Sequence, residues 1–538
     1  MKRTLLLLAL AATLALPFWL RPARDAGLAA ASADDTVVII SPHNEAIRHE
    51  FGLAFARWYR ARTGRTVAVD WRSIGGTSEI ARYLEGEYNT SFQNLWTGRF
   101  GQTWSTEVQA GFTNPKAPAG TPAAAARAAF LASDAGCGLD LMFGGGSFDF
   151  KAQAAAGRLV DCGLLQAHPG WFTDAVIPPA FAGEDYWDPQ GRWIGCALSA
   201  FGLVFNRDEV ARRGLPGPPV QWADLADPRY IGGVALADPT KSGSIAKAFE
   251  NLIQQQMQAR LTELTAAGAA GAAGKNSEVR AVNEGWVTGL RMLQLISANA
   301  RYFTDSSQKV PIDVAAGDCA AGMCIDSYGR QQAEAVMRRA GSDRAVYVSP
   351  VGGTVCSADP IGLLRGAPHR TVALAFIEFA LSPEGQALWN LRPGTPGGPE
   401  QYALRRLPIR KDFYADVALK PYRSDPAENP YATASPLTYH SAWTGGVFRE
   451  LSFIIKVVDI DPHPELVEAW RAILAAGRPT ADMAVLQDLS AVDYAAANGR
   501  IHAALAAKDP AEQIRLAAEL GAAFRMQYRR AAEVARAR

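Results

Sequence analysis

Six clusters of glycine and small polar residues form the part of the sequence that could bind a ligand. Each follows an apolar run of strand length, and most precede a helical pattern; the clusters are residues 41–45, 75–79, 144–147, 238–244, 326–330 and 352–354. Glycine lets a ligand approach the backbone closely, and the start of a helix offers unpaired N–H groups and a partial positive charge. Although glycine and serine are also ordinary turn residues, clusters at several strand ends favour a ligand cleft, because open α/β sheets bind ligands there.

A second pattern could carry nucleophilic catalysis. Ser244 and Lys247 have the S-x-x-K spacing of serine penicillin-recognising enzymes, in which the lysine lowers the cost of deprotonating the serine. The companion motifs S-D-N and K-T-G occur nowhere in the sequence. Because a four-residue match is expected by chance in a chain of 538 residues, we do not read this spacing as a catalytic site. A secreted serine hydrolase that uses Ser244 and Lys247 is the alternative.

The composition places these residues in a folded, globular protein. Hydrophobic residues make up 49% of the 538 residues and charged residues 20%, which excludes a disordered, collagen-like or multi-pass membrane protein. The 54 basic and 53 acidic residues give a net charge of +1, so nucleic acid is not an expected partner. The length predicts two to four domains or one large two-lobed body.

The first 33 residues have the composition of an export signal. Lys2 and Arg3 precede an apolar run from residue 4 to residue 20, and residues 31–33 (Ala-Ser-Ala) provide a cleavage site. This arrangement is typical of a secretory signal peptide, so we expect residues 1–33 to be removed and the protein to be periplasmic. The alternative is an uncleaved membrane anchor, since the apolar run approaches the length of a spanning helix.

Six cysteines, an even number, permit three disulfides in an exported chain. Cys319 and Cys324 are close enough in sequence to pair. Their C-x4-C spacing lacks the second Cys/His pair of a structural zinc site. We therefore expect disulfides, with buried free thiols as the alternative and a metal site as the weakest interpretation.

Alternating strand and helix patterns predict an α/β protein with a largely parallel sheet. Runs of strand length occur at residues 36–41, 67–71, 139–143, 200–206, 234–237, 320–325 and 346–351. Helical spacing follows several of them, as in residues 47–58, a helix that Gly64 ends. Residues 87–136 interrupt the pattern and are expected to be an insertion. From about residue 464 to residue 538 the chain is alanine-rich and mostly helical.

Seven stretches, taken in order, resemble the exported substrate-binding proteins of bacterial ABC importers, within their ferric-iron-type branch. They are TVVIISPHNEAIRHEFGLAFARWYRARTGRTVAVDW, DLMFGGGSFDFKAQAAAGRLV, FGLVFNRDEV, WADLADPRYIGGVALADPTKSGS, YVSPVGGTVCSADPIGLLRGAP, FIEFALSPEGQALW and RLPIR. Together they span about residues 36–412, apart from the insertion. The set in this order is specific to the family, whereas no single piece is.

The resemblance implies a type II periplasmic-binding-protein fold, with two α/β lobes that are joined by a two-strand hinge and close on a ligand. By chain order, the domains are a first lobe at 36–195, a second lobe at 196–345, a return to the first lobe at 346–414, and a mostly helical C-terminal extension at 415–538. It also implies a non-enzymatic protein, without a cofactor, that delivers its ligand to an ABC permease in the inner membrane. We expect a monomer, with docking to a membrane sensor as the alternative to docking to a permease.

Metal-binding members of this family use a histidine, a glutamate and two consecutive tyrosines. By the resemblance, His43 and Tyr328 occupy two of these positions, whereas glycine (residues 144–146) replaces the glutamate and Ser327 replaces the first tyrosine. Since ferric iron prefers hard anionic oxygens, these losses should weaken iron binding greatly. The ligand is therefore expected to be a small anion such as a phosphate or phosphonate, or else ferric iron held by His43 and Tyr328.

Both lobes are expected to contact the ligand. The side chains or N–H groups that we expect there are His43, Asn44, Thr77, Gly145, Gly146, Ser147 and, near the first hinge passage, Ser199, together with Thr240, Ser242, Ser244, Ser327 and Tyr328. The serine and threonine residues of cluster 238–244 would meet the anionic part at a helix N-terminus. Ser327 and Tyr328 would close over the ligand from the second lobe.

Overall fold

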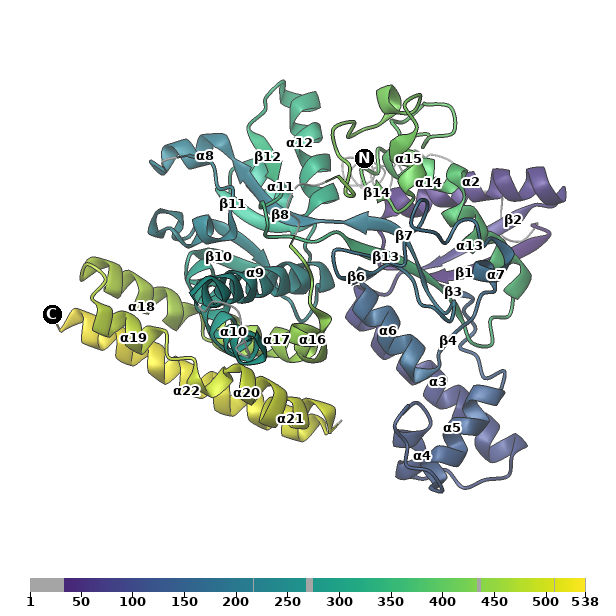
Figure 1. Ribbon diagram of the computed structural model, residues 1–538, viewed down its shortest axis with the longest axis horizontal. Helices are drawn as coiled ribbons and strands as arrows, with labels where there is room; N and C mark the ends of the chain where they lie inside the picture. Colours follow the sequence, from purple (N-terminus) through teal and green to yellow (C-terminus); the bar gives the residue numbers. More distant parts are fainter. Residues whose placement is uncertain (1–32, 216, 268–273, 433–436, 508, 538) are drawn as a thin grey trace, which may run out of the picture.

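The protein folds around two large neighbouring β-sheets, each covered by helices, with further helices at its C-terminal end (Figure 1). A small two-stranded sheet pairs β5 (Ala180–Phe181) with β6 (Glu184–Asp185). The computed structural model describes residues 33–537 except 216, 268–273, 433–436 and 508. The predicted signal peptide or anchor, apart from its last residue, lies outside the described residues. In the described part of the chain, no helix has both the length and the apolar character needed to cross a membrane.

The first sheet has the strand order β14-β7-β13-β3-β1-β2, with β4 paired to β13. Its strands are β1 (Asp35–Ile40), β2 (Val67–Arg72), β3 (Leu141–Phe143), β4 (Leu159–Val160), β7 (Ile194–Ser199), β13 (Ser357–Leu364) and β14 (Leu407–Pro408). Strand β1 is parallel to β2 and β3, whereas β13 is antiparallel to β3 and β7. We call this sheet and the helices packed on it lobe 1.

The second sheet has the strand order β10-β9-β11-β8-β12. Its strands are β8 (Phe201–Asn206), β9 (Val234–Ala237), β10 (Ala300–Thr304), β11 (Ala321–Ile325) and β12 (Ala345–Val348). Strand β9 is parallel to β10 and β11, and β8 is antiparallel to β11 and β12. We call this sheet and its helices lobe 2.

The prediction of a two-lobed α/β fold is confirmed, but the sheets are mixed rather than largely parallel. The chain passes from β7 to β8 and from β12 to β13 without a crossover helix. Strand β8, which starts after the first passage, is antiparallel to β11, and β13, which starts after the second passage, is antiparallel to β3. A direct passage without a crossover helix therefore adds antiparallel strands to the sheets. The passages lie at residues 199–201 and 348–357, and the predicted domain boundaries at 195 and 345 remain predictions.

Helix α2 (Glu45–Thr63) illustrates how local sequence places a helix on lobe 1. The Asn44 side chain accepts a hydrogen bond from the Ile47 N–H at its start, and Gly64 ends it in the left-handed conformation. Phe51 on its inner face packs against Phe143 of β3 and Trp389. The other helices of eight or more residues are α3 (Thr77–Asn94), α5 (Pro122–Ala132), α6 (Ser147–Ala156), α9 (Gly243–Ala267), α10 (Gly274–Ala298), α11 (Lys309–Ala316), α12 (Asp326–Ala340), α13 (Arg370–Leu381), α14 (Pro383–Asn390), α17 (Phe448–Ile455), α18 (His463–Ala475) and α22 (Pro510–Arg536).

The predicted insertion at residues 87–136 begins inside α3 and continues through α4 (Thr106–Gly111) and α5. An aromatic cluster stabilises it: the ring centroid of Phe92 lies 4.9 Å from that of Phe112 and 5.3 Å from that of Phe130. In Figure 1, α4 and α5 project below lobe 1, beyond α6.

The C-terminal extension divides between the lobes. Tyr431 lies beside lobe 1, where its hydroxyl donates to the carbonyl of Ile409. From α16 (Ser441–Thr444) onward the chain packs on lobe 2 instead, and Trp470 donates to Asn299 at 3.0 Å. Apolar residues of α17, α18 and α22 belong to the same buried cluster as β8, β9 and β11. Lobe 2 and the helices after residue 441 therefore share one hydrophobic core.

All six cysteines lie in the described part of the chain and all are free thiols, which contradicts the expected disulfides. Cys324 lies in the extended strand β11, where the chain advances about 3.3 Å per residue. The three steps from Ala321 to Cys324 within this strand already cover about 10 Å, more than the roughly 7 Å Cα distance that a disulfide tolerates, and Cys319 lies before the strand begins. Close spacing in sequence was misleading because a strand, unlike a turn, separates the two residues.

A buried carboxyl in the extension gives a testable pH dependence of stability. Asp459 is 2% exposed, and burial raises its pKa to about 8. The unfolded chain releases this proton near its ordinary pKa, so stability falls as the pH rises from about 4 to 8. Asp459→Asn should raise Tm above the wild-type value at pH 8 and change it little at pH 4, measured by calorimetry. Asp416→Asn, at an exposed site, is the control, and an equal effect of Asp459→Asn at both pH values would contradict the prediction.

Candidate functional site

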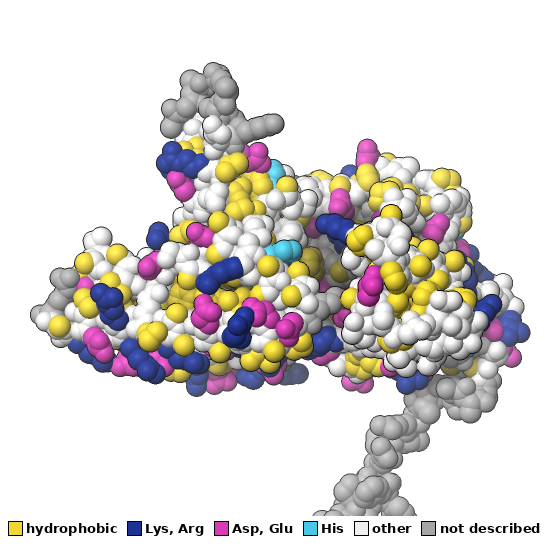
Figure 2. All heavy atoms as spheres, turned by 90° about the horizontal axis from the view of Figure 1, so that it is seen from below, with side chains coloured by type: hydrophobic (Ala, Val, Ile, Leu, Met, Phe, Trp, Pro, Cys, Tyr) yellow, Lys and Arg dark blue, Asp and Glu magenta, His cyan; other side chains and the backbone are white. Residues whose placement is uncertain are grey.

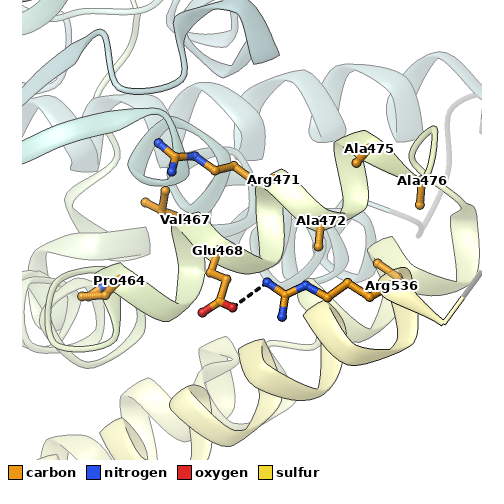
Figure 3. A pocket seen from close by; sticks show the side chains of 9 residues that line it. Pro464, Val467, Glu468, Arg471, Ala472, Ala475, Ala476 and Arg536 are labelled. Carbon is orange, nitrogen blue, oxygen red and sulfur yellow. Dashed lines mark hydrogen bonds and ion pairs between the residues drawn. The ribbon is translucent and has the colours of Figure 1, made fainter.

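A cleft of about 900 Å³ lies between the lobes. Residues of lobe 1, of lobe 2 and of the C-terminal extension line it. A second depression, of about 610 Å³, lies between α18 and α22, where Figure 3 shows the ion pair of Glu468 and Arg536 at 2.6 Å. That depression is lined largely by alanine and by this paired charge, whereas the interlobe cleft holds glycine loops and helix starts. We therefore place the candidate site in the interlobe cleft.

Three helices begin at the cleft. Helices α3 and α6 of lobe 1 start at Thr77 and Ser147, and α9 of lobe 2 starts at Gly243. The lobes meet closely here, because a Cβ on Gly76 would lie 2.9 Å from the carbonyl oxygen of Lys241. Gly145 has a φ of 129° and lies against Thr77, so a larger residue fits neither the conformation nor the space. The glycines therefore let three helix N-termini converge on one volume.

A buried carboxylate organises the lobe 1 side of the cleft. Asp359 accepts hydrogen bonds from the Gly145 N–H at 2.7 Å and from His43 Nε2 at 3.1 Å, and it pairs with Arg406. Burial acts to raise the pKa of Asp359, but Arg406 and His43 outweigh it, so the net shift is downward. Arg406 also donates to Ser199. The nitrogens His43 Nδ1 and Arg406 Nε are buried without a hydrogen-bond partner, which is uncommon for buried polar atoms.

A second carboxyl in the cleft has a raised pKa. Burial raises the pKa of Asp149 to about 6, although hydrogen bonds from Thr77 and the Gly146 backbone act in the opposite direction. Asp149 lies in the first turn of α6 and occupies donors that an anion would otherwise use. The charge of this group, and with it the charge of the cleft, changes near neutral pH.

Most residues expected at the ligand line the cleft together; these are His43, Thr77, Gly145, Gly146, Ser147, Ser199, Ser242, Ser244 and Tyr328. Three others lie outside the lining. Asn44 is the cap of α2, and Thr240 donates to Asp238 at 2.6 Å, so both side chains serve local structure. Ser327 is 1% exposed at the start of α12, beneath the surface of the cleft.

Sequence reasoning missed two groups that line the cleft. The first group is Asp359, which lies in an apolar strand, and Arg406, which follows a loop. Both fall within stretches that resemble the binding-protein family, but neither was expected to contact the ligand. The second group is Tyr439, Ser441, Gly445 and Phe448 of the extension, for which the sequence held no pattern.

The geometry opposes the serine hydrolase. Lys247 donates to Glu184 at 2.6 Å and to Glu250 at 2.8 Å, and it lies 3.6 Å from the ring centroid of Tyr439. Burial acts to lower the pKa of Lys247, but the two carboxylates outweigh it and hold the pKa well above its ordinary value. A permanently protonated lysine cannot take a proton from Ser244.

The described residues also contain no group of three or more His, Cys, Asp or Glu side chains that could hold a metal ion. The two expected iron ligands have other partners: His43 contacts Asp359, and the Tyr328 hydroxyl accepts from Gln308 at 3.1 Å.

On the face drawn in Figure 2, basic and acidic side chains are intermixed, in agreement with the net charge of +1.

Comparison with curated proteins gives partial matches. The phosphoglycerate transport regulatory protein PgtC of Salmonella typhimurium is 27% identical over 195 residues, which are 36% of this chain and 40% of PgtC. An uncharacterized protein of Haemophilus influenzae is 25% identical over 253 residues, 46% of this chain and 60% of that protein. The match thus spans about two fifths of the length of PgtC.

Comparison with solved structures gives matches at low sequence identity. The periplasmic binding protein AfuA from Actinobacillus pleuropneumoniae, with fructose-6-phosphate bound, has 15% identity and a TM-score of 0.42, over 71% of this chain and 86% of AfuA. Iron-bound HitA from Pseudomonas aeruginosa has 17% identity and a TM-score of 0.42, over 78% of this chain and 98% of HitA. Residues 140–414, which are just over half of the chain, match the model of the family described as bacterial extracellular solute-binding protein. The chain belongs to the bacterial extracellular solute-binding proteins, a family of non-enzymatic binding proteins.

Proposed function

We propose that this protein captures a small organic anion in the interlobe cleft and delivers it to an ABC permease in the inner membrane. One observation carries the choice of an anion: three helix N-termini and the buried Arg406, with an unpartnered Nε, converge on one cleft. Family membership and the predicted signal peptide support the permease and the periplasmic location, and we propose that the protein acts as a monomer.

Local groups, and not the overall charge, would recognise the anion. The other cations of the cleft have carboxylate partners: Lys151 pairs with Asp185 and Lys241 with Asp305, both at 2.7 Å. Arg406 shares Asp359 with His43, and the Nε of Arg406 remains without a hydrogen-bond partner. Backbone N–H groups at the helix starts are additional hydrogen-bond donors, and they do not lose their proton in the physiological pH range.

Ferric iron fits these groups less well. Iron needs several hard anionic oxygens, and of the expected ligands only His43 and Tyr328 line the cleft. The Arg406 guanidinium beside His43 and Asp359 would repel a trivalent cation. A volume of about 900 Å³ suits an organic molecule more than a bare ion. The similarity to PgtC, named for phosphoglycerate transport, supports a phosphorylated or carboxylated ligand.

Ligand sensing is the second candidate, because PgtC is named a transport regulatory protein. Ligand delivery and ligand sensing predict different effects of deleting the gene on uptake. If the protein delivers ligand, deletion of its gene should abolish uptake of radiolabelled phosphoglycerate even when the permease genes are expressed from a constitutive promoter. If the deletion strain takes up phosphoglycerate normally under that promoter, sensing is favoured, because the protein was then needed only for transcription of the permease genes.

The role of Arg406 can be measured directly. In the purified wild type, phosphoglycerate should raise Tm by several degrees, whereas ferric citrate should not. Arg406→Gln should weaken phosphoglycerate binding about 10- to 100-fold in calorimetry, the range for loss of a charge-assisted hydrogen bond. If the unpaired Asp359 destabilises that variant, Arg406→Gln with Asp359→Asn removes both charges. Arg410→Gln is the matched control, since Arg410 is also buried and paired but lies outside the cleft lining. Equal losses in Arg406→Gln and Arg410→Gln would refute the assignment.

The raised pKa of Asp149 predicts a pH dependence of binding. As the pH falls through about 6, Asp149 gains a proton and stops repelling an anion, so affinity should rise. Asp149→Asn mimics the protonated form, so at pH 7.5 it should bind phosphoglycerate about tenfold more tightly than wild type. At pH 5 the two proteins should bind alike. The comparison of variants cancels the titration of the ligand itself, and an affinity ratio that stays constant with pH would exclude Asp149 from the site.

A further inference from the structure

Residues 437–448 of the extension are fixed on lobe 2 beside the cleft. The Gln254 side chain of α9 donates to the carbonyl of His440 at 3.0 Å and accepts from the His440 N–H at 2.8 Å. Thr444 donates to Glu250 of the same helix. Trp443 is 4% exposed and donates to Glu278 of α10 at 2.8 Å. These contacts tie the segment to two long helices, so the positions of its side chains are set by the core of lobe 2.

The same segment contacts lobe 1 on the other side of the cleft. The Tyr439 N–H donates to the carbonyl of Ala182 at 2.8 Å, between β5 (Ala180–Phe181) and β6 (Glu184–Asp185). The approach requires glycine at position 183, since a Cβ there would lie 1.9 Å from the Tyr439 carbonyl oxygen. Farther along, the rings of Phe448 and Phe148 have centroids 4.7 Å apart. The segment therefore closes one side of the cleft between the lobes.

The hydroxyls of Tyr439 and Thr444 in this segment already have partners. The Tyr439 hydroxyl donates to Glu250 at 3.0 Å, and the Tyr439 ring covers the ammonium of Lys247. Lys247 in turn bridges Glu184 of lobe 1 and Glu250 of lobe 2. The segment thus offers a ligand little free charge. It offers aromatic surface, which Phe448 and Tyr439 share with Phe148 from lobe 1.

We propose that residues 437–448 form a third wall of the ligand site, which binds the carbon skeleton of the anion through aromatic contact. This inference rests on the proposed function: the helix starts and Arg406 hold the charged group, and the third wall selects what is attached to it. The ligand class is an organic anion with an apolar or flat part large enough to reach Phe448. Free phosphate would make only the polar contacts.

Two probes separate these contributions, namely inorganic phosphate and phenyl phosphate, each titrated calorimetrically into the full-length protein. Wild type should bind phenyl phosphate at least tenfold more tightly than inorganic phosphate. Phe448→Ala should lower the affinity for phenyl phosphate about tenfold and leave the affinity for inorganic phosphate unchanged. The affinity of Phe448→Leu for phenyl phosphate should lie between those of wild type and Phe448→Ala, since leucine keeps apolar volume without the ring.

Phe453→Ala is the matched control, because Phe453 lies on the same helix but packs against the core outside the cleft. It should leave the ratio of the two affinities unchanged even if it lowers Tm. If both probes bind but Phe448→Ala leaves that ratio unchanged, the third wall is wrong and the proposed function stands. If neither probe binds to wild type, the proposed function and this inference are both wrong.

Discussion

The site depends on one buried carboxylate. Asp359, at 4% exposure, must be compensated if it is to stay ionised inside the protein. Its partners come from three separate parts of lobe 1: His43 after β1, Gly145 after β3 and Arg406 before β14. Each of these loops would otherwise be free to move at the end of its strand. By satisfying one charge they are fixed relative to one another, and the helix starts that follow β1 and β3 are fixed with them.

The strands and helices of lobe 1 could largely be predicted from the sequence, because their cause is local. Apolar runs mark β1 and β3, and Asn44 and Gly64 mark the ends of α2. The loops that carry His43, Thr77 and Gly145 followed from the same reasoning, since a ligand site lies at the ends of such strands. Asp359 could not be recognised in this way. Its neighbours in sequence are apolar, and its partner His43 is 316 residues away.

The residues that lie outside the cleft lining share a physical cause. Asn44 and Thr240 have the residue type of ligand contacts, but their side chains are used by the nearest backbone or carboxylate group, a competition that residue type alone does not reveal. The extension showed helical composition and nothing about its location. Its packing against lobe 2 depends on apolar faces such as those of Trp470 and Tyr528, which indicate burial without naming the partner surface.

Lobe 1, lobe 2 and the C-terminal extension all line the cleft, and the two ends of the folded chain lie on different lobes. The chain passes between the lobes at residues 199–201 and 348–357, and again between Tyr431 on lobe 1 and Trp443 on lobe 2. An odd number of passages leaves β1 on one lobe and α22 on the other, as Figure 1 shows. Any tether on the N-terminal side of β1 would therefore hold lobe 1 and leave lobe 2 as the moving body. Two fluorophores, one at each end of the folded chain, would report the opening of the cleft directly as a change in energy transfer.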